Sequence, residues 1–248
     1  MKILDLFSGI GGFSLGLERA GMQTAAFCEV DPTCRRVLKK HWPNVPIFED
    51  VKTLSAKDIH ETVDVICGGF PCQDISTAGK GAGLAGERSG LWYEYRRLIE
   101  EIRPRYIIIE NVAVLRSRGL DEVLRCLTTL GYDAEWHCIP ASAIGAPHRR
   151  DRIWIIAYPM RQRTQVSTEG QQSAEQVLRG PSEAWRTGAY AAWWATKPRV
   201  SRMDYGVSGR VDRVNQCGNA VVPQIAELIG HSIIKHKGIA DAMAQQWG

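Results

Sequence analysis

Residues 2–12, KILDLFSGIGG, join a short hydrophobic strand to a glycine-rich turn. A helix near residues 12–20 is expected next, because Phe13 and Leu17 are spaced to share one buried face. Strand, glycine turn and helix is the arrangement with which α/β proteins bring a ligand against the backbone at the amino end of a helix. Ser14 stands where the dinucleotide fingerprint GxGxxG has its last glycine, which argues against a nicotinamide enzyme.

Acidic residues end the next two expected strands. Glu29 and Asp31 lie at the end of a strand over residues 24–30, and Asp50 ends a strand over residues 47–50. An acidic residue roughly twenty positions after the glycines typically binds the ribose hydroxyls of a cofactor that contains adenosine. These side chains follow successive strands at their carboxyl ends, so the sequence predicts a site for such a cofactor there.

One cysteine stands out from the other six. Cys72 lies in the loop GGFPCQD, residues 68–74, just past a hydrophobic strand over residues 63–67. Cys67 lies inside that apolar strand, where a thiol behaves as a small and inert hydrophobe. Pro71 stiffens the chain before Cys72 and polar residues follow it, so this sulfur is directed outward rather than packed. The position of Cys72 in this loop therefore indicates that its thiol is a nucleophile.

Two further segments place charge at the ends of apolar strands. Residues 106–112, YIIIENV, form a strand suited to burial on both faces, and Glu110 emerges at its end. Partial desolvation there raises the pKa of a carboxyl group and lets it donate a proton. Residues 145–152, GAPHRRDR, precede the core strand IWIIA of residues 153–157, so we expect at least one arginine to point into the cleft.

The order of elements predicts an α/β fold, a mostly parallel sheet with helices on both faces. The last two strands have no helix between them, so we expect an antiparallel pair. A helix over residues 221–236 should return to complete the first domain. The expected strands lie near residues 2–7, 24–30, 47–50, 63–67, 106–110, 133–139 and 152–158, and the expected helices near 12–20, 32–41, 91–102 and 120–130.

In this order the segments resemble the motifs of DNA (cytosine-5)-methyltransferases, in particular compact members carried by phages and prophages. The matching segments are DLFSGIGGFSLGLERAG (5–21), GGFPCQDIS (68–76), Glu110-Asn111-Val112, His148 to Arg152, and Gly218 to Val221. His148 departs from the glutamine that the family usually has. The resemblance implies the Rossmann-like fold of methyltransferases that use S-adenosylmethionine, and methyl transfer to carbon 5 of a flipped cytosine through a covalent Cys72 adduct.

The resemblance also implies roles for individual residues. The catalytic set is Cys72, Glu110, Arg150 and Arg152. The residues that bind S-adenosylmethionine are Phe7, Ser8, Gly9, Gly11, Gly12, Glu29, Asp50, Pro71 and Asn219. The residues that bind DNA are Ser76, Lys80, Arg88, His148, Arg149 and Arg213. Residues 1–158 and 219–248 form the expected catalytic domain, and residues 159–218 a small, reduced target-recognition region.

Charge and composition agree with a protein that binds nucleic acid. Residues 1–140 carry 17 basic and 19 acidic side chains, a balance of −2, whereas residues 141–248 carry 14 and 8, a balance of +6. Arginine supplies 22 of the 31 cations, and its fork suits phosphates and guanine edges. We expect double-stranded DNA as the partner of the basic half, with a separate recognition partner or a cognate restriction enzyme as further candidates.

Other features of the composition limit the class of protein to which the chain can belong. Seven cysteines without CxxC spacing and scattered histidines argue against a disulfide framework or a metal site, and favour a reducing cytoplasm. The sequence has neither a signal-like leader nor an apolar run that could span a bilayer. Two alternatives stay open: a cytosine-5 methyltransferase that acts on tRNA, and a non-catalytic binding or regulatory relative. Methyl transfer to a panel of substrates separates the DNA enzyme from the tRNA enzyme, and the presence of Cys72, Glu110 and Arg152 together argues against the non-catalytic relative.

Overall fold

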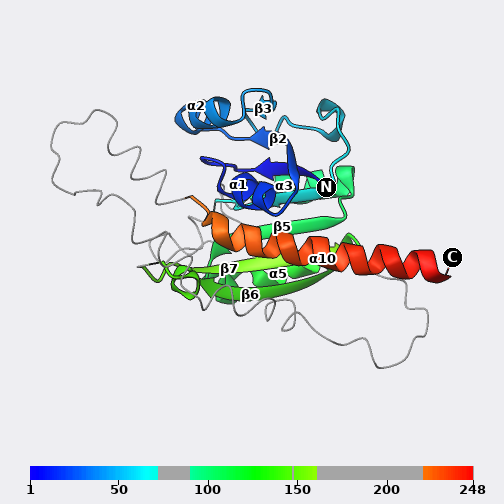
Figure 1. Cartoon of the computed structure of the whole chain (residues 1–248). Helices are drawn as coiled ribbons and strands as arrows, with labels where there is room; N and C mark the ends of the chain where they lie inside the picture. Colours follow the sequence, from blue (N-terminus) through cyan, green and yellow to red (C-terminus); the bar gives the residue numbers. More distant parts are fainter. Residues whose placement is uncertain (72–89, 147, 161–219, 248) are drawn as a thin grey trace.

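The protein is built on one seven-stranded sheet (Figure 1). The computed structural model describes residues 1–71, 90–146, 148–160 and 220–247, with side chains as far as residue 235 in the last helix. In the order of the sheet the strands are β3 (Ile47–Phe48), β2 (Gln23–Cys28), β1 (Lys2–Leu6), β4 (Val65–Gly68), β5 (Tyr106–Val112), β7 (Asp151–Pro159) and β6 (Tyr132–Pro140). The seven predicted strands are confirmed.

Strand direction follows the connections along the chain. The β3-β2-β1-β4-β5 part of the sheet is parallel. Helices connect β1 to β2, β2 to β3 and β4 to β5, and a short 3-10 turn lies between β3 and β4. The β7 strand runs antiparallel to both β5 and β6, which confirms the antiparallel pair expected from the missing helix. The sheet is therefore mostly parallel, and the carboxyl ends of β1, β2, β4 and β5 lie along one edge.

Helices cover both faces, as predicted. They are α1 (Gly12–Arg19), α2 (Pro32–His41), α3 (Leu91–Ile102), α4 (Leu115–Arg118), α5 (Leu120–Thr129) and α10 (Pro223–Trp247), with 3-10 turns at Ala56–Asp58 and Ala141–Ile144. Alternation along the strands sorts the core, since successive side chains point to opposite faces. On β5, Ile107 and Ile109 pack with α3 and α5, whereas Ile108 packs with α1 and α10.

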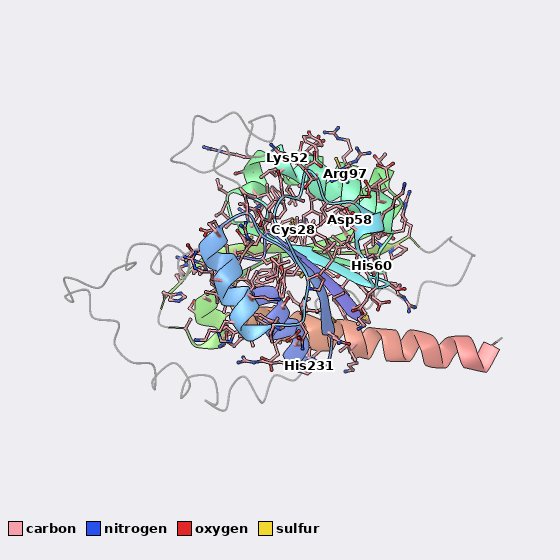
Figure 2. The ribbon with its side chains drawn as sticks, turned by 90° about the horizontal axis from the view of Figure 1, so that it is seen from above. Cys28, Lys52, Asp58, His60, Arg97 and His231 are labelled. Atoms are coloured by element: carbon pink, nitrogen blue, oxygen red, sulfur yellow. The ribbon has the colours of Figure 1, made fainter. Side chains whose placement is uncertain are left out.

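The carboxyl-terminal helix packs on α1 across one face of the sheet (Figure 1), which confirms the predicted return of the chain. Small residues allow this close contact. A Cβ built on Gly16 would overlap the carbonyl oxygen of Pro223, and one built on Gly230 would lie 2.7 Å from the Cβ of Ala20. The α10 helix continues to Trp247, beyond the predicted end at residue 236, and its last turns extend past the sheet (Figures 1 and 2).

Two other boundaries differ from expectation. The β3 strand covers only Ile47–Phe48, so Asp50 lies two residues beyond its end, in a turn, rather than at the end of the strand itself. The short α4 helix was not expected; it forms a single turn directly before α5. Among the described helices, none is both long and apolar enough to cross a membrane.

Candidate active site

The β1–α1 turn gathers the first group of predicted residues. Phe7 adopts a left-handed backbone conformation (φ 53°) and turns the chain out of the sheet. Ser8 is buried, and its hydroxyl donates hydrogen bonds to the carbonyl oxygens of Asp5 (2.6 Å) and Cys28 (3.3 Å). Gly9 also has a positive φ (55°), and a Cβ built on it would meet nothing within 4 Å. The backbone of Gly9 therefore faces open space, as a ligand would require.

Glu29 ties this turn to the end of β2. One carboxylate oxygen, Oε2, accepts a hydrogen bond from the Gly9 N–H at 2.7 Å, and Oε1 accepts one from the Asp31 N–H at 2.8 Å. Asp31 then caps α2 by accepting from the N–H groups of Thr33 and Cys34. A buried carboxylate held between two backbone amides is fixed in position, so its remaining lone pairs have a defined direction.

The other two glycines of the turn are packed against protein. A Cβ built on Gly11 would lie 2.7 Å from the Trp42 ring, and one on Gly12 would lie 2.5 Å from the carbonyl oxygen of Val221. Both therefore let neighbouring segments approach, and their backbone is less open to a ligand than that of Gly9. Val30 exposes 74% of its surface directly after Glu29. No pattern in the sequence marks that valine.

Beneath the turn lies a carboxyl group with no exposed surface. Asp5 accepts hydrogen bonds through Oδ2 from the backbone N–H (3.2 Å) and the hydroxyl (2.8 Å) of Ser14. Its Oδ1 has no hydrogen-bond partner among the described residues. Burial raises the pKa of Asp5 to about 8, the bonds from Ser14 opposing it. Asp5 is thus largely protonated at neutral pH and anchors the first turn of α1.

The second group lies at the ends of β5 and β7. Glu110 is 7% exposed, and its Oε1 is 3.0 Å from Nε of Arg152. Burial raises the pKa of Glu110 above its usual range, although the charges of Arg152 and Arg150 act in the opposite direction. The predicted rise in this pKa is confirmed, and so is the arginine that points inward. A carboxyl group with a raised pKa keeps a proton that it can donate to higher pH than an ordinary glutamate does.

The chain that leads to Cys72 is fastened next to this carboxyl group. The side-chain amide of Asn111 donates a hydrogen bond to the carbonyl oxygen of Phe70 at 3.1 Å. The Phe70 ring is buried and lies 5.4 Å from the Trp92 ring, between centroids. A Cβ built on Gly69 would lie 2.9 Å from Oε2 of Glu110, so glycine permits the close approach of the two segments.

The remaining arginines have different positions. Arg150 is partly buried, adopts a positive φ (36°), and donates through Nη2 to the carbonyl oxygen of Ala220 at 2.8 Å. Burial, with the charge of Arg152, lowers the pKa of its guanidinium. Arg149 exposes 84% of its side chain and pairs with Asp151 at 3.1 Å. His148 is exposed beside it. Arg149 and His148 are thus placed to meet an external partner, whereas Arg150 joins the amino end of α10 to the site.

Several predicted residues lie outside the described ranges. They are Cys72, Ser76, Lys80, Arg88, Arg213 and Asn219. Pro71, the last described residue before Cys72, is partly exposed next to Phe70. The described residues form two groups along one edge of the sheet, Gly9 with Glu29 and Glu110 with Arg152. Between them runs β4, whose Gly68 is paired with both Leu6 and Ile109.

Comparisons with known proteins agree with this arrangement. Residues 1–187 match the model of the family described as C-5 cytosine-specific DNA methylase. The Type II methyltransferase M2.BsuMI of Bacillus subtilis (strain 168) is 35% identical over 202 residues, which cover 78% of this chain and 51% of that protein. The Type II methyltransferase M.Eco47II of Escherichia coli is 37% identical over 161 residues, 62% of this chain and 39% of that protein.

A solved structure gives the same result for the fold. A prophage-encoded protein of E. coli, proposed to be a DNA modification methyltransferase, matches with a TM-score of 0.55 and 27% identity, over 64% of this chain and 47% of that one. The present chain thus spans about half or less of the length of these relatives.

Proposed function

The chain belongs to the C-5 cytosine-specific DNA methylase family, and from this premise we propose that it transfers a methyl group from S-adenosylmethionine to carbon 5 of cytosine in DNA. The observation that carries the proposal is the pair of the buried Glu110 and the partly buried Arg152, 3.0 Å apart, beside the segment that leads to Cys72. Burial favours the protonated form of the Glu110 carboxyl group against the charge of Arg152, which suits an acid that must hold a proton until a base arrives.

Each residue of the catalytic set has a chemical task. Carbon 5 of cytosine is a weak nucleophile, so the Cys72 sulfur adds to carbon 6 and breaks the ring's 5,6 double bond. Glu110 donates a proton or a hydrogen bond to ring nitrogen 3, which stabilises the enamine. Carbon 5 then takes the methyl group. Removal of the carbon-5 proton drives the electron pair back into the ring and expels Cys72. Arg152 and Arg150 hold the base's carbonyl oxygen and its phosphate.

The residues near Gly9 suit an adenosine-containing cofactor. The open face of Gly9 and the fixed carboxylate of Glu29 fit a ribose with its hydroxyls. Val30 offers exposed apolar surface for a flat ring, and the exposed Asp50 offers an acceptor for an amino group. S-Adenosylmethionine would supply the methyl group as an electrophile. Phe7, Ser8, Gly11, Gly12, Pro71 and Asn219 complete the proposed set that binds it.

DNA binding follows from the charge and from the reaction. A base inside a duplex cannot reach a buried Glu110, so the target cytosine is flipped out of the helix. The exposed Arg149 and His148 lie at the edge of the site and contact the phosphates. Ser76, Lys80, Arg88 and Arg213 contribute further contacts to the DNA. Residues 159–218 form the small target-recognition region, between the two parts of the catalytic domain.

The proposal is tested with the full chain and tritiated S-adenosylmethionine. Unmodified plasmid DNA should become labelled, and bisulfite sequencing should locate the methylated cytosines in one sequence context. The Cys72→Ala variant should lose this activity, whereas Cys138→Ala, which removes an exposed thiol on β6, should keep it. Activity in the Cys72→Ala variant equal to that of the unchanged chain would disprove the mechanism.

Testing tRNA as a second substrate distinguishes a DNA methyltransferase from an RNA methyltransferase. Label in tRNA but not in DNA would favour the RNA methyltransferase and overturn the proposed substrate. DNA that contains 5-fluorocytosine adds a direct test of the adduct: fluorine replaces the proton that must leave carbon 5, so the covalent complex with Cys72 should accumulate. A complex that migrates as protein plus DNA in denaturing gels is the expected result.

A further inference from the structure

Arg97 of α3 holds the turn that follows Asp50. Its Nη2 donates hydrogen bonds to the carbonyl oxygens of Val51 and Leu54, both at 2.9 Å. Figure 2 shows Arg97 next to Lys52, which lies within this turn. One guanidinium nitrogen therefore fastens both ends of residues 51–54 to the helix.

Two acidic residues of the same helix orient the guanidinium. Nε of Arg97 donates to Oε2 of Glu94 at 2.8 Å, and Nη1 donates to Oε1 of Glu101 at 2.6 Å. The other oxygen of Glu101 accepts from the Ala56 N–H at 2.9 Å, just beyond the turn. With its planar fork bound on three sides, the Arg97 guanidinium has one direction in which it can point.

Asp50 is part of the structure that Arg97 fixes. Its carbonyl oxygen accepts from the N–H groups of Thr53 and Leu54, both at 3.2 Å, and its Oδ1 accepts from the Lys52 N–H at 2.9 Å. The side chain of Leu54 is 2% exposed and lies in the core. The exposed carboxylate of Asp50 is thus held through a turn whose two ends depend on Arg97.

We propose that Arg97 is a positioning residue for the cofactor: it fixes the turn of residues 51–54 so that the Asp50 carboxylate meets the amino group of adenine. This inference rests on the proposed function, which assigns Asp50 to the adenine. Trp92, in the first turn of the same helix, packs against Phe70 in the segment that leads to Cys72. The α3 helix therefore supports the cofactor side and the nucleophile side of the site together.

The test measures cofactor binding by the full chain. Isothermal titration calorimetry should show that Arg97→Met raises the Kd for S-adenosylmethionine about tenfold, at a temperature where circular dichroism shows the variant folded. Arg97→Lys keeps the charge and one set of donors, so its Kd should lie between that of the unchanged chain and that of Arg97→Met. Arg96→Met is the matched control, because Arg96 pairs with Glu100 on the same helix, and its Kd should equal that of the unchanged chain.

Selectivity between two cofactor analogues distinguishes a positioning role of Arg97 from a general loss of structure. The unchanged chain should prefer S-adenosylhomocysteine over S-inosylhomocysteine, which has a carbonyl where adenine has its amino group. Arg97→Met and Asp50→Ala should each reduce this preference, and the double variant should reduce it no further than Asp50→Ala alone. An unchanged Kd and preference in both Arg97 variants would overturn the inference. An unchanged chain that binds no S-adenosylmethionine would instead overturn the cofactor part of the proposed function.

Discussion

The side-chain amide of Asn111 donates a hydrogen bond to the carbonyl oxygen of Phe70, so the end of β5 holds the chain two residues before Cys72. Asn111 is 4% exposed, and its Oδ1 accepts from the N–H of Val112 at 2.8 Å. The nitrogen of the Asn111 amide thus bonds the segment that follows β4, and the oxygen bonds the next residue of β5. Glu110 is the preceding residue, so one short segment positions the acid and the backbone that leads to the nucleophile.

Replacing Asn111 by Ala should slow methyl transfer much more than it weakens binding of S-adenosylmethionine. The variant loses the bond to Phe70 and leaves a buried carbonyl oxygen unpaired, which costs about 1–3 kcal/mol of folding free energy. Initial rates at saturating cofactor and DNA give kcat, and calorimetry gives the Kd for the cofactor. A tenfold rise in Kd with unchanged kcat would show that Asn111 serves the cofactor side instead.

The raised pKa of Glu110 predicts a fall in activity at high pH. The protonated form, which donates to the base, persists to higher pH than for an ordinary glutamate and is lost as pH rises through the raised pKa. Glu110→Gln cannot ionise, so its remaining activity should be lower by about 10²–10⁴-fold and should lack that fall. The measurement is kcat across pH. Glu61→Gln, an exposed residue paired with Lys2, should keep the profile of the unchanged chain.

Local patterns in the sequence were sufficient to predict most elements of this fold, although not the short α4 helix. The α3 helix covers Leu91–Ile102 as predicted, because Trp92, Tyr95 and Leu98 recur at helical spacing and are all fully buried. The parallel strands were equally clear, since runs such as Ile107 to Ile109 are apolar on both faces. In both cases the signal lies within one segment and does not depend on distant contacts.

Contacts between distant segments were not predictable in the same way. Arg97 and Asn111 bind backbone carbonyl oxygens. Every type of residue has such a carbonyl, so the sequence does not show which residue is the acceptor. Glycines are ambiguous for a related reason. Gly9 and Gly12 stand in one motif, yet the first faces open space and the second faces the carbonyl of Val221, more than two hundred residues along the chain.

Asp5 predicts a specific dependence of stability on pH. Its pKa is about 8 in the folded protein against 3.8 as its ordinary value, so folding takes up a proton between these pH values. The free energy of unfolding should therefore fall as pH rises through this range, by at most about 1.4 kcal/mol per pH unit. Asp5→Asn cannot ionise and should remove this part of the slope. Urea unfolding of both proteins at several pH values tests this; parallel curves would contradict it.

The contact between α1 and α10 predicts that Gly16→Ala destabilises the protein. Alanine favours a helix over glycine by about 1 kcal/mol, so propensity alone would stabilise the variant. The added Cβ would overlap the carbonyl oxygen of Pro223 and force α10 away from α1, at a cost of about 1–3 kcal/mol. Leu15→Ala is the control on the same helix: Leu15 is 38% exposed, and its loss should cost less than about 1 kcal/mol. Urea unfolding gives both values, and hydrogen exchange should show faster exchange in α10 of Gly16→Ala alone. If Gly16→Ala proved more stable than the unchanged chain, the two helices would not depend on this close approach.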